Sequence, residues 1–415
     1  MPEPSSGRRR IAVTGIGPVT PIGTGVEEFW SSLIAGKSGA GPITRFDATD
    51  FKSKIAAEVK GFDIGTYLPA ARARRMDRFA QLAYAAATLA LADAGMKPTD
   101  PDPTRVGMVI GSGIGGIGLW EEEHTMRLKR GPRFVSPSLI AMMIPNAAAG
   151  SLAIEFGFTG PNECTVTACA SSGHAMARAM DYIRYGAADV VVVGGAESCI
   201  SPMSVASFCA ARALSTRNDD PEHASRPFDA TRDGFVIGEA ATCLVFESME
   251  HAKGRGARIL AEAIGYGLSS DAYHMVASHP DGAGAGAAMT AALADAQIAP
   301  GEVGYINAHA TSTNVGDASE AKAVRKVFGS SPPPTSATKS MTGHLLGAAA
   351  ATEAAVCVLS MNRGMLPPTI NYETPDPECD LDVIPNVARE ADVEVTMCNS
   401  FGFGGHNVAV LFGRV

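Results

Sequence analysis

The stretch Thr165-Val166-Thr167-Ala168-Cys169-Ala170-Ser171-Ser172 joins a strand-like run to an alanine-rich helical segment at residues 170–185. A second stretch, Thr335-Ser336-Ala337-Thr338-Lys339, leads in the same way toward a helical segment at residues 345–359. Each passage has β-branched residues, a turn of small residues and a long helix. Their similarity predicts an internal duplication, with an N-terminal half (residues 1–255) and a C-terminal half (residues 256–415) that meet at Gly254-Arg255-Gly256.

Short apolar runs alternate with helical stretches along the rest of the chain. Residues 78–94 have the apolar spacing of a helix, and Gly95 ends it. This alternation predicts an α/β fold whose sheets are largely buried. The expected strands are residues 11–14, 106–110, 190–193, 243–246, 259–264, 304–307 and 408–412.

Composition limits the class of protein. The 415 residues are 46% hydrophobic, which is enough for a large core. The net charge of -9 argues against nucleic-acid binding, which needs a basic face. None of the eight cysteines forms a CxxC pair, so we expect reduced thiols, a cytoplasmic location and no zinc. Residues 1–10 are polar and no apolar run approaches the ~20 residues that span a bilayer, so no membrane attachment is expected.

One glycine-rich segment fits the pattern of a dinucleotide-binding loop. Gly111-Ser112-Gly113-Ile114-Gly115-Gly116 follows an expected strand. That pattern also needs an acidic residue at the end of a following strand, whereas Glu121-Glu122-Glu123 lie in a helix-like stretch. No tyrosine has a lysine four residues later, as short-chain dehydrogenases do. We therefore favour close packing of turns as the role of these glycines over an NAD-dependent dehydrogenase.

Cys169 stands where a strand-like run passes into a helix. The positive end of a helix lowers the pKa of a thiol and increases its thiolate fraction. His309 follows an expected strand, and His344 precedes a helix. A buried structural role is the alternative for each residue taken alone. Together, a cysteine and two histidines form a nucleophile-and-base set for covalent catalysis.

A further segment lies near the C-terminus, Asn399-Ser400-Phe401-Gly402-Phe403-Gly404-Gly405. Alone, it is either an ordinary turn or a source of backbone N–H groups for an oxyanion. In this order, the segments resemble the β-ketoacyl-acyl-carrier-protein synthases, from Arg10 to Phe412. The resemblance implies a thiolase-like fold in α-β-α-β-α layers. It extends to residues 210–218, which look most like synthase II, and to residues 225–238, 269–274 and 338–347.

The resemblance implies a role for several side chains. Cys169 is the nucleophile that becomes acylated, and His309 and His344 face it. Lys339 and Glu353 are charges that support the site. The backbone N–H groups of Cys169 and Phe403 are expected to hold the oxyanion. Thr311 and Thr313 match threonines of the pantetheine channel, Phe401 and Phe403 match an aromatic pair beside the acyl pocket, and Asn307, Glu353 and Asn399 lie where some members hold a monovalent cation.

The implied reaction is a decarboxylative Claisen condensation, in which malonyl carrier protein elongates a cysteine-bound acyl chain by two carbons. No cofactor is expected. The expected partners are acyl carrier protein and a second copy of the chain, paired through strands, with residues 190–193 as a suitable strand. A polyketide ketosynthase with the same chemistry is the main alternative. A thiolase acting on coenzyme A fits less well, because residues 401–405 lack its second cysteine, and a non-catalytic chain-length partner would lack Cys169.

Three positions depart from the family pattern. Ala310 stands where glycine is common, His406 replaces a frequent threonine, and Ala240-Ala241 replaces a more glycine-rich stretch. None of them removes a catalytic group. Because Ala310 and His406 flank the site, the preferred chain length stays open.

A basic cluster occurs at Arg72, Arg74 and Arg75. Carrier proteins are typically acidic, so docking to a chain with a net charge of -9 needs a local basic patch. Arg74 and Arg75 lie where related synthases dock the carrier, and Arg133 and Arg212 match two further basic positions. The alternative is a solvated helix face.

Overall fold

The computed structural model describes residues 7–415, so the first six residues of the polar N-terminal segment lie outside the described part. Within this range, one mixed sheet of eleven strands forms the centre of the molecule. Its strands are β1 (Ile11–Thr20), β2 (Gly23–Thr24), β5 (Val106–Gly111), β6 (Asn162–Glu163), β7 (Val190–Glu197), β8 (Ala240–Ser248), β9 (Ala261–Ser270), β10 (Tyr305–Asn307), β11 (Thr335–Ser336), β14 (Val395–Gly402) and β15 (His406–Gly413).

The strand order displays the duplication that the sequence predicts. Outward from the neighbours β1 and β9, one half runs β8, β7, β5, β6 and the other runs β15, β14, β10, β11. In both halves the first two steps are antiparallel and the last two are parallel. β1 and β9 join the halves through the pairs Ala12–Glu262 and Val13–Ala261. The boundary at residue 255 stays a prediction.

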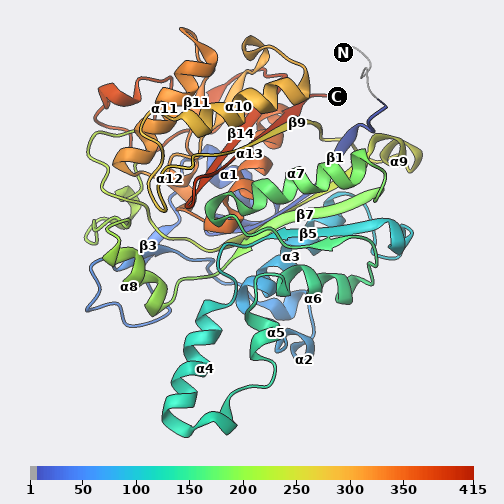
Figure 1. Ribbon diagram of the computed structural model, residues 1–415, viewed down its shortest axis with the longest axis vertical. Helices are drawn as coiled ribbons and strands as arrows, with labels where there is room; N and C mark the ends of the chain where they lie inside the picture. The colour runs from blue at the N-terminus through green and yellow to red at the C-terminus, as the bar shows by residue number, and fades with distance from the viewer. Residues whose placement is uncertain (1–6) are drawn as a thin grey trace.

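Helices form three layers around the two halves of the sheet (Figure 1). α3 and α6 cover the outer face of the first half, and α10, with α11 against it, covers the outer face of the second. α7 and α13 contact strands of both halves and therefore lie between them. This is the expected α-β-α-β-α arrangement. The bounds are α3 (Arg78–Asp93), α6 (Ala147–Phe156), α7 (Ser171–Arg184), α10 (Ala283–Ala296), α11 (Asn314–Phe328) and α13 (Ala349–Arg363).

Glycines let the outer helices approach the two central strands. A Cβ atom on Gly17 of β1 would lie 2.1 Å from the carbonyl oxygen of Ala86 in α3. A Cβ atom on Gly267 of β9 would lie 2.1 Å from the carbonyl oxygen of Ala288 in α10. No side chain fits at such distances, so in each half a glycine on the central strand lets the outer helix pack directly against the backbone of that strand.

Each of the seven strands expected from the apolar runs overlaps an observed strand, and the helix expected at residues 78–94 spans Arg78–Asp93. The strand-like run predicted at residues 165–169 is wrong. The strand there is Asn162–Glu163, and Ala168–Ala170 form a 3₁₀ turn, because the chain leaves the sheet before it enters α7. The helix predicted from residue 345 begins at Ala349, after a similar 3₁₀ turn at Leu346–Ala348.

The expectation that residues 190–193 pair with a second subunit is also wrong. They belong to β7, whose two edges are already occupied by β5 and β8. At this end of the sheet the outermost strand is β6, which pairs only with β5 among the described strands. A strand with a free edge is the one that can add another strand.

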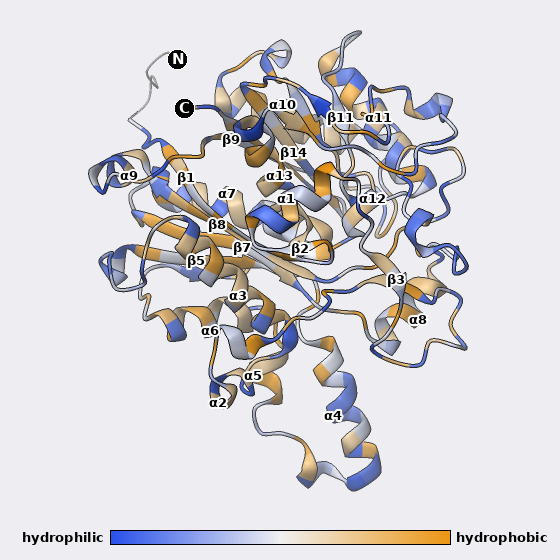
Figure 2. Ribbon diagram, turned by 180° about the vertical axis from the view of Figure 1, so that it is seen from behind, coloured by the Kyte–Doolittle hydropathy of each residue, from blue (hydrophilic) through white to orange (hydrophobic). Residues whose placement is uncertain are grey.

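An arm of α4 (Ile117–Arg130) and α5 (Leu139–Met143) projects from the body (Figure 1). No residue of α4 is buried. Figure 2 shows hydrophobic colours along the central strands and α13, and hydrophilic colours at the far end of α4. No helix within residues 7–415 is both long and apolar enough to cross a bilayer.

Candidate active site

A cavity of about 470 Å³ opens where the two halves of the molecule meet. The sequence-predicted residues Cys169, His309, Thr311, Thr313, His344, Phe401 and Phe403 all line it, together with Arg212. Their positions span residues 169 to 403, so only the fold brings them together. The cavity wall also contains residues that sequence reasoning missed, among them Ile114, Glu197, Phe208, Asp233 and Phe235.

Cys169 sits in the 3₁₀ turn of Ala168–Ala170, just before α7 begins at Ser171. Ala168 has a φ of 51°, which is uncommon for a residue with a side chain. Gly402 permits β14 to pass directly against this turn, because a Cβ atom there would lie 2.4 Å from the carbonyl oxygen of Thr167. The Ser400 hydroxyl donates to the Cys169 carbonyl at 3.0 Å, so β14 fixes the turn that carries the sulfur.

The Cys169 Sγ atom lies 2.9 Å from Nε2 of His344. The backbone N–H groups of Phe403 and of Cys169 also point at the sulfur and stabilise its anion. Burial nevertheless raises the pKa of the Cys169 thiol to about 12, despite the opposing charge of Lys339. The lowered pKa that the sequence predicted is therefore wrong, because removal from water outweighs the helix end. At neutral pH the sulfur is a thiol hydrogen-bonded to an imidazole.

The two histidines face each other across the cavity. Their ring centroids are 5.5 Å apart at an interplanar angle of 83°. Burial lowers the pKa of His309 and of His344 well below the usual 6.5, and the positive charge of Lys339 lowers both further. Both rings are therefore neutral at pH 7. The Nδ1 atom of each ring is buried without a hydrogen-bond partner among the described residues, so no neighbour there fixes either tautomer.

Lys339 and Glu353 form a buried ion pair behind the histidines. Their side chains are 1% and 3% exposed, and the Lys339 ammonium donates directly to Oε1 of Glu353. Burial raises the pKa of Glu353 to about 7, although Lys339 opposes this shift. The pair thus places a fixed positive charge near both imidazoles, as the sequence comparison implied.

Glu320 of α11 holds the segment that carries His309, and the sequence analysis did not identify it. Its carboxylate accepts the backbone N–H groups of His309 at 2.9 Å and of Ala310 at 2.7 Å. Burial raises the pKa of Glu320 to about 7. An acidic residue between Ser319 and Ala321, on the buried face of a helix, was the available signal in the sequence.

The glycine-rich segment at residues 111–116 binds a side chain of the protein itself. The carboxylate of Glu197, fully buried at the end of β7, accepts backbone N–H groups from Gly113 at 2.7 Å, Ile114 at 3.1 Å and Gly347 at 3.0 Å. A Cβ atom on Gly113 would lie 2.9 Å from this carboxylate. The loop therefore uses its N–H groups as phosphate-binding loops do, but they bind an anion of the protein itself. This agrees with the rejection of a dinucleotide-binding role for the segment.

Three buried side-chain oxygens of the residues suggested to hold a cation have no hydrogen-bond partner among the described residues. They are Oδ1 of Asn307, Oδ1 of Asn399 and Oε2 of Glu353. Oxygen donors of this kind suit a monovalent cation, so these atoms fit the cation that the sequence comparison suggested. Within residues 7–415, no group of three or more His, Cys, Asp or Glu side chains is arranged to hold a metal ion.

Hydroxyl and aromatic side chains also line the cavity. Oγ1 of Thr311 and Oγ1 of Thr313 are 3.1 Å apart. The Phe401 ring packs against His309 with centroids 5.7 Å apart, and Phe403 is 38% exposed on the turn between β14 and β15. Gly404 and Gly405 complete this turn with φ angles of 87° and 75°.

Of the departures from the family pattern, Ala310 is buried beside Glu320, and Ala240 and Ala241 are buried in β8. His406 is exposed, and its ring packs against the turn at Gly404. A Cβ atom on Gly404 would lie 3.1 Å from the nearest ring atoms of His406. Its ring faces His174 of α7 with centroids 6.2 Å apart.

The four arginines proposed to dock a carrier are all exposed. Arg74 and Arg75 follow α2 (Ala70–Ala73), whereas their neighbour Arg72 forms an ion pair with Glu155 at 2.8 Å. Arg212 has a φ of 55° and lines the cavity. Arg133 lies in the 3₁₀ turn Pro132–Phe134, between α4 and α5.

Family models match most of the chain. The model described as "Beta-ketoacyl synthase, N-terminal domain" matches residues 8–252, and "Beta-ketoacyl synthase, C-terminal domain" matches residues 260–373. A 3-oxoacyl-[acyl-carrier-protein] synthase 2 of Synechocystis is 47% identical over 98% of both chains.

Solved structures show the same fold. The ishigamide ketosynthase/chain length factor superposes with a TM-score of 0.93 at 38% identity, covering 98% of this chain and 100% of that one. A chain of the AntDE:AntF complex, described as a type II PKS acyl-carrier protein in complex with its ketosynthase bound to the hexaketide, superposes with a TM-score of 0.91 at 36% identity and the same coverage.

The raised pKa of Cys169 predicts how fast iodoacetamide alkylates the resting protein. Only the thiolate reacts, so the rate at Cys169 should rise about tenfold per pH unit from pH 6 to pH 8, without a plateau. Peptide mass spectrometry quantifies the label, and Cys169→Ala identifies labelling at other cysteines. A rate that levels off below pH 7 would show a thiolate at rest and contradict the protonated state.

Proposed function

Since this chain belongs to the beta-ketoacyl synthase family, we propose that it elongates acyl chains on acyl carrier protein as a 3-oxoacyl-[acyl-carrier-protein] synthase of the second type. The chain is an acyltransferase, and the reaction is a decarboxylative condensation with malonyl carrier protein. The observation that carries the proposal is the 2.9 Å contact between Cys169 Sγ and His344 Nε2, with His309 facing both.

In the first half of the reaction, Cys169 takes the acyl group from a carrier thioester. As Sγ attacks the carbonyl carbon, its proton passes to Nε2 of His344 and then to the departing carrier sulfur. The backbone N–H groups of Cys169 and Phe403 stabilise the tetrahedral oxyanion, an effect of about 3 kcal/mol per donor. One thioester replaces another, so this transfer is close to balanced in free energy.

In the second half, the malonyl thioester loses carbon dioxide and leaves an enolate. Neutral His309 and His344 donate N–H hydrogen bonds to the enolate oxygen. Because no partner in the described part of the chain fixes the Nδ1 tautomer, His344 can accept a proton in the first half and donate in the second. The enolate carbon then attacks the acyl carbonyl, Cys169 leaves as a thiolate, and the product is two carbons longer.

The surrounding residues support these steps. Burial, reinforced by the charge of Lys339, keeps both imidazoles neutral, and Glu353 compensates the Lys339 charge in the dry interior. Thr311 and Thr313 bind the pantetheine arm, and the exposed Phe403 ring gates the acyl pocket beside Phe401. A monovalent cation held by the free oxygens of Asn307, Asn399 and Glu353 would add positive charge behind the site.

A polyketide ketosynthase is the second candidate function. It is favoured by the close superposition on the ishigamide and AntDE:AntF ketosynthases, at TM-scores of 0.93 and 0.91. Both functions use the same side chains, and the 47% identity to the Synechocystis enzyme favours fatty acid elongation. The two functions can be separated by comparing turnover of malonyl carrier protein with saturated acyl primers of increasing length and with polyketide primers. The cytoplasmic location stays a prediction.

We infer that the working form is a homodimer joined at β6. This strand ends the sheet, and its neighbours in sequence expose apolar side chains: Ile154 of α6 is 80% exposed and Val166 is 52% exposed. Pairing β6 with a second copy would extend the sheet and cover these side chains.

Trapping tests the assigned nucleophile and base. Incubation with acyl carrier protein alone should add one acyl group to Cys169, located by peptide mass spectrometry. His309→Ala and His344→Ala should each lower condensation more than about 100-fold, because the enolate loses a donor. Acylation of Cys169 should persist in His309→Ala and become slower in His344→Ala, which also loses the acceptor of the thiol proton. Cys169→Ala is the control for labelling. Acyl label on another cysteine, or wild-type condensation by His344→Ala, would refute the assignment.

Charge reversal tests the docking surface. Arg74→Glu/Arg75→Glu should raise the KM for carrier-bound substrates about tenfold or more and leave the KM for small pantetheine thioesters unchanged, since only the carrier is acidic. Lys97→Glu/Lys253→Glu, at two other exposed positions, changes the net charge equally and should leave both KM values unchanged. Equal losses with both substrate types, or by both variants, would show that no local patch docks the carrier.

The oligomeric state follows from the free edge of β6. Light scattering at micromolar concentration should give about twice the chain mass of 42.8 kDa. A mass of one chain under these conditions would contradict the homodimer.

A further inference from the structure

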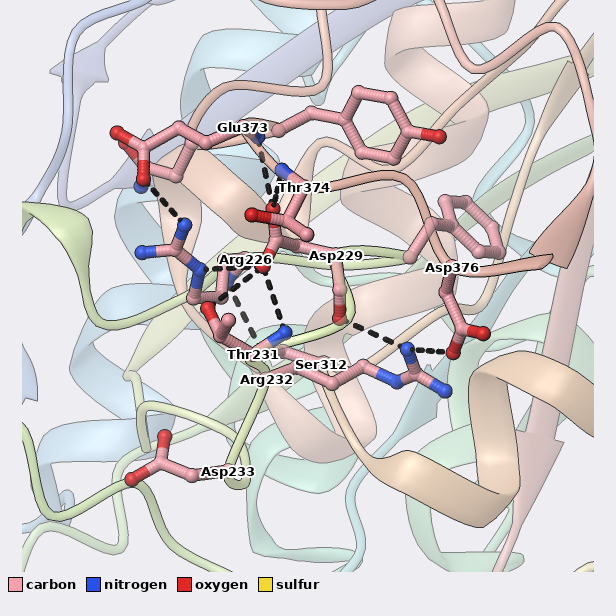
Figure 3. Close-up of polar contacts among 12 residues, drawn as sticks. Arg226, Asp229, Thr231, Arg232, Asp233, Ser312, Glu373, Thr374 and Asp376 are labelled. Atoms are coloured by element: carbon pink, nitrogen blue, oxygen red, sulfur yellow. Dashed lines mark hydrogen bonds and ion pairs between the residues drawn. The ribbon is translucent and has the colours of Figure 1, made fainter. Parts of the chain in front are cut away.

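A buried ionic cluster joins residues 226–232 to residues 373–376 (Figure 3). Asp229 is at its centre and accepts the backbone N–H groups of Glu373 at 2.8 Å and Thr374 at 2.6 Å, with Nε of Arg226 at 3.1 Å. The Arg232 guanidinium extends from the same loop to Oδ2 of Asp376 at 2.6 Å. Arg226, Asp229 and Arg232 are all at most 4% exposed. None of these three side chains lines the cavity, so the catalytic steps above do not use them directly.

The cluster faces the segment that carries the two cavity threonines. Between them, Ser312 has a φ of 70°, a left-handed conformation that costs a residue with a side chain about 1 kcal/mol or more. Its hydroxyl accepts the backbone N–H of Arg226 at 3.0 Å, and its carbonyl accepts the backbone N–H of Gly234 at 3.0 Å. These bonds hold Ser312 in a conformation that turns its neighbours Thr311 and Thr313 to the cavity.

Arg232 and Asp317 hold Thr313 from both sides of its backbone. The Asp317 carboxylate accepts the N–H of Thr313 at 3.2 Å, and Nε of Arg232 donates to the carbonyl of Thr313 at 3.1 Å. A second guanidinium nitrogen of Arg232 donates to the carbonyl of Asn314 at 2.8 Å. The two charges are 3.7 Å apart, with side-chain exposures of 2% and 0%. Thr313 is therefore held by an ion pair from which water is excluded.

A lysine could not reproduce these contacts. The planar fork of Arg232 reaches four oxygens, namely the carbonyls of Asp229, Thr313 and Asn314 and the carboxylate of Asp376. An ammonium is a compact charge with one nitrogen, so it can satisfy only part of this set. With the fork lost, the carbonyls of Thr313 and Asn314 would lose the donors that fix the threonine segment.

We propose that Arg232 is a positioning residue for substrate binding, which sets the Thr311 and Thr313 hydroxyls, 3.1 Å apart, to receive the amide groups of a pantetheine arm. The proposal rests on the proposed function, because a carrier-bound thioester must enter this cavity. The hydroxyls contact the arm and not the reacting carbon. Displacing them therefore weakens binding in the ground state and the transition state equally, which changes KM and not kcat.

Kinetics with acyl and malonyl pantetheine thioesters test this role without any carrier surface. Arg232→Lys should raise the KM about tenfold, equivalent to about 1.4 kcal/mol, with kcat within about twofold of the wild type. Thr311→Val/Thr313→Val should raise the KM similarly. Combining the threonine changes with Arg232→Lys should add little, because both remove the same contacts. Asp317→Asn, similar in shape, supplies a second test if Arg232→Lys does not fold.

Arg184→Lys is the matched control, because Arg184 is also nearly buried and ion-paired, with Asp295 at 2.8 Å, but lies on α7 away from the cavity lining. It should leave both KM and kcat unchanged. A fall in kcat at unchanged KM, or additive losses in the combined variant, would overturn the role assigned to Arg232. Wild-type protein that fails to condense would instead refute the proposed function, so the two failures are distinguishable.

Discussion

The contact between the Cys169 sulfur and the His344 imidazole, at 2.9 Å, requires two halves of the chain to be placed within a fraction of an ångström. Cys169 precedes α7 in the first half, and His344 precedes α13 in the second. Both helices lie in the central layer, where strands of both halves contact them. The buried middle layer is therefore what assembles the site, and the mirrored strand order places the two helix starts at one cavity.

Burial then decides the charges of the site. The same exclusion of water raises the pKa of Cys169 and lowers the pKa values of His309 and His344, so all three are neutral at rest. A neutral imidazole is what the enolate needs as a hydrogen-bond donor. The cost is a nucleophile that must lose its proton during attack, and the neighbouring imidazole accepts it. The positive charge of Lys339 acts on all three groups: it lowers the pKa values of both histidines and opposes the rise in the pKa of Cys169.

Buried carboxylates hold the loops that surround the cavity. Glu197 accepts N–H groups from the glycine-rich loop and from Gly347, Glu320 accepts those beside His309, and Asp317 accepts those of Phe228 and Thr313. Loops at strand ends have few backbone partners, and an unpaired buried N–H group costs about 1–3 kcal/mol. An ionised side chain can satisfy several such groups at once, so the loops around the reacting atoms become as fixed as the sheet.

The sequence by itself determined the strands, the duplication and the identity of the central residues, because buried strands need apolar runs and Cys169, His309 and His344 stand in segments of recognisable order. Tertiary structure decided the rest. Whether Cys169 is thiol or thiolate depends on how much water reaches it, and that is set by residues far along the chain, such as Phe235 and Leu346, which share a buried cluster with it. The partners of Glu197, Glu320 and Arg232 lie up to 150 residues away. No local pattern records such distances, since they arise only when loops from both halves close around one cavity.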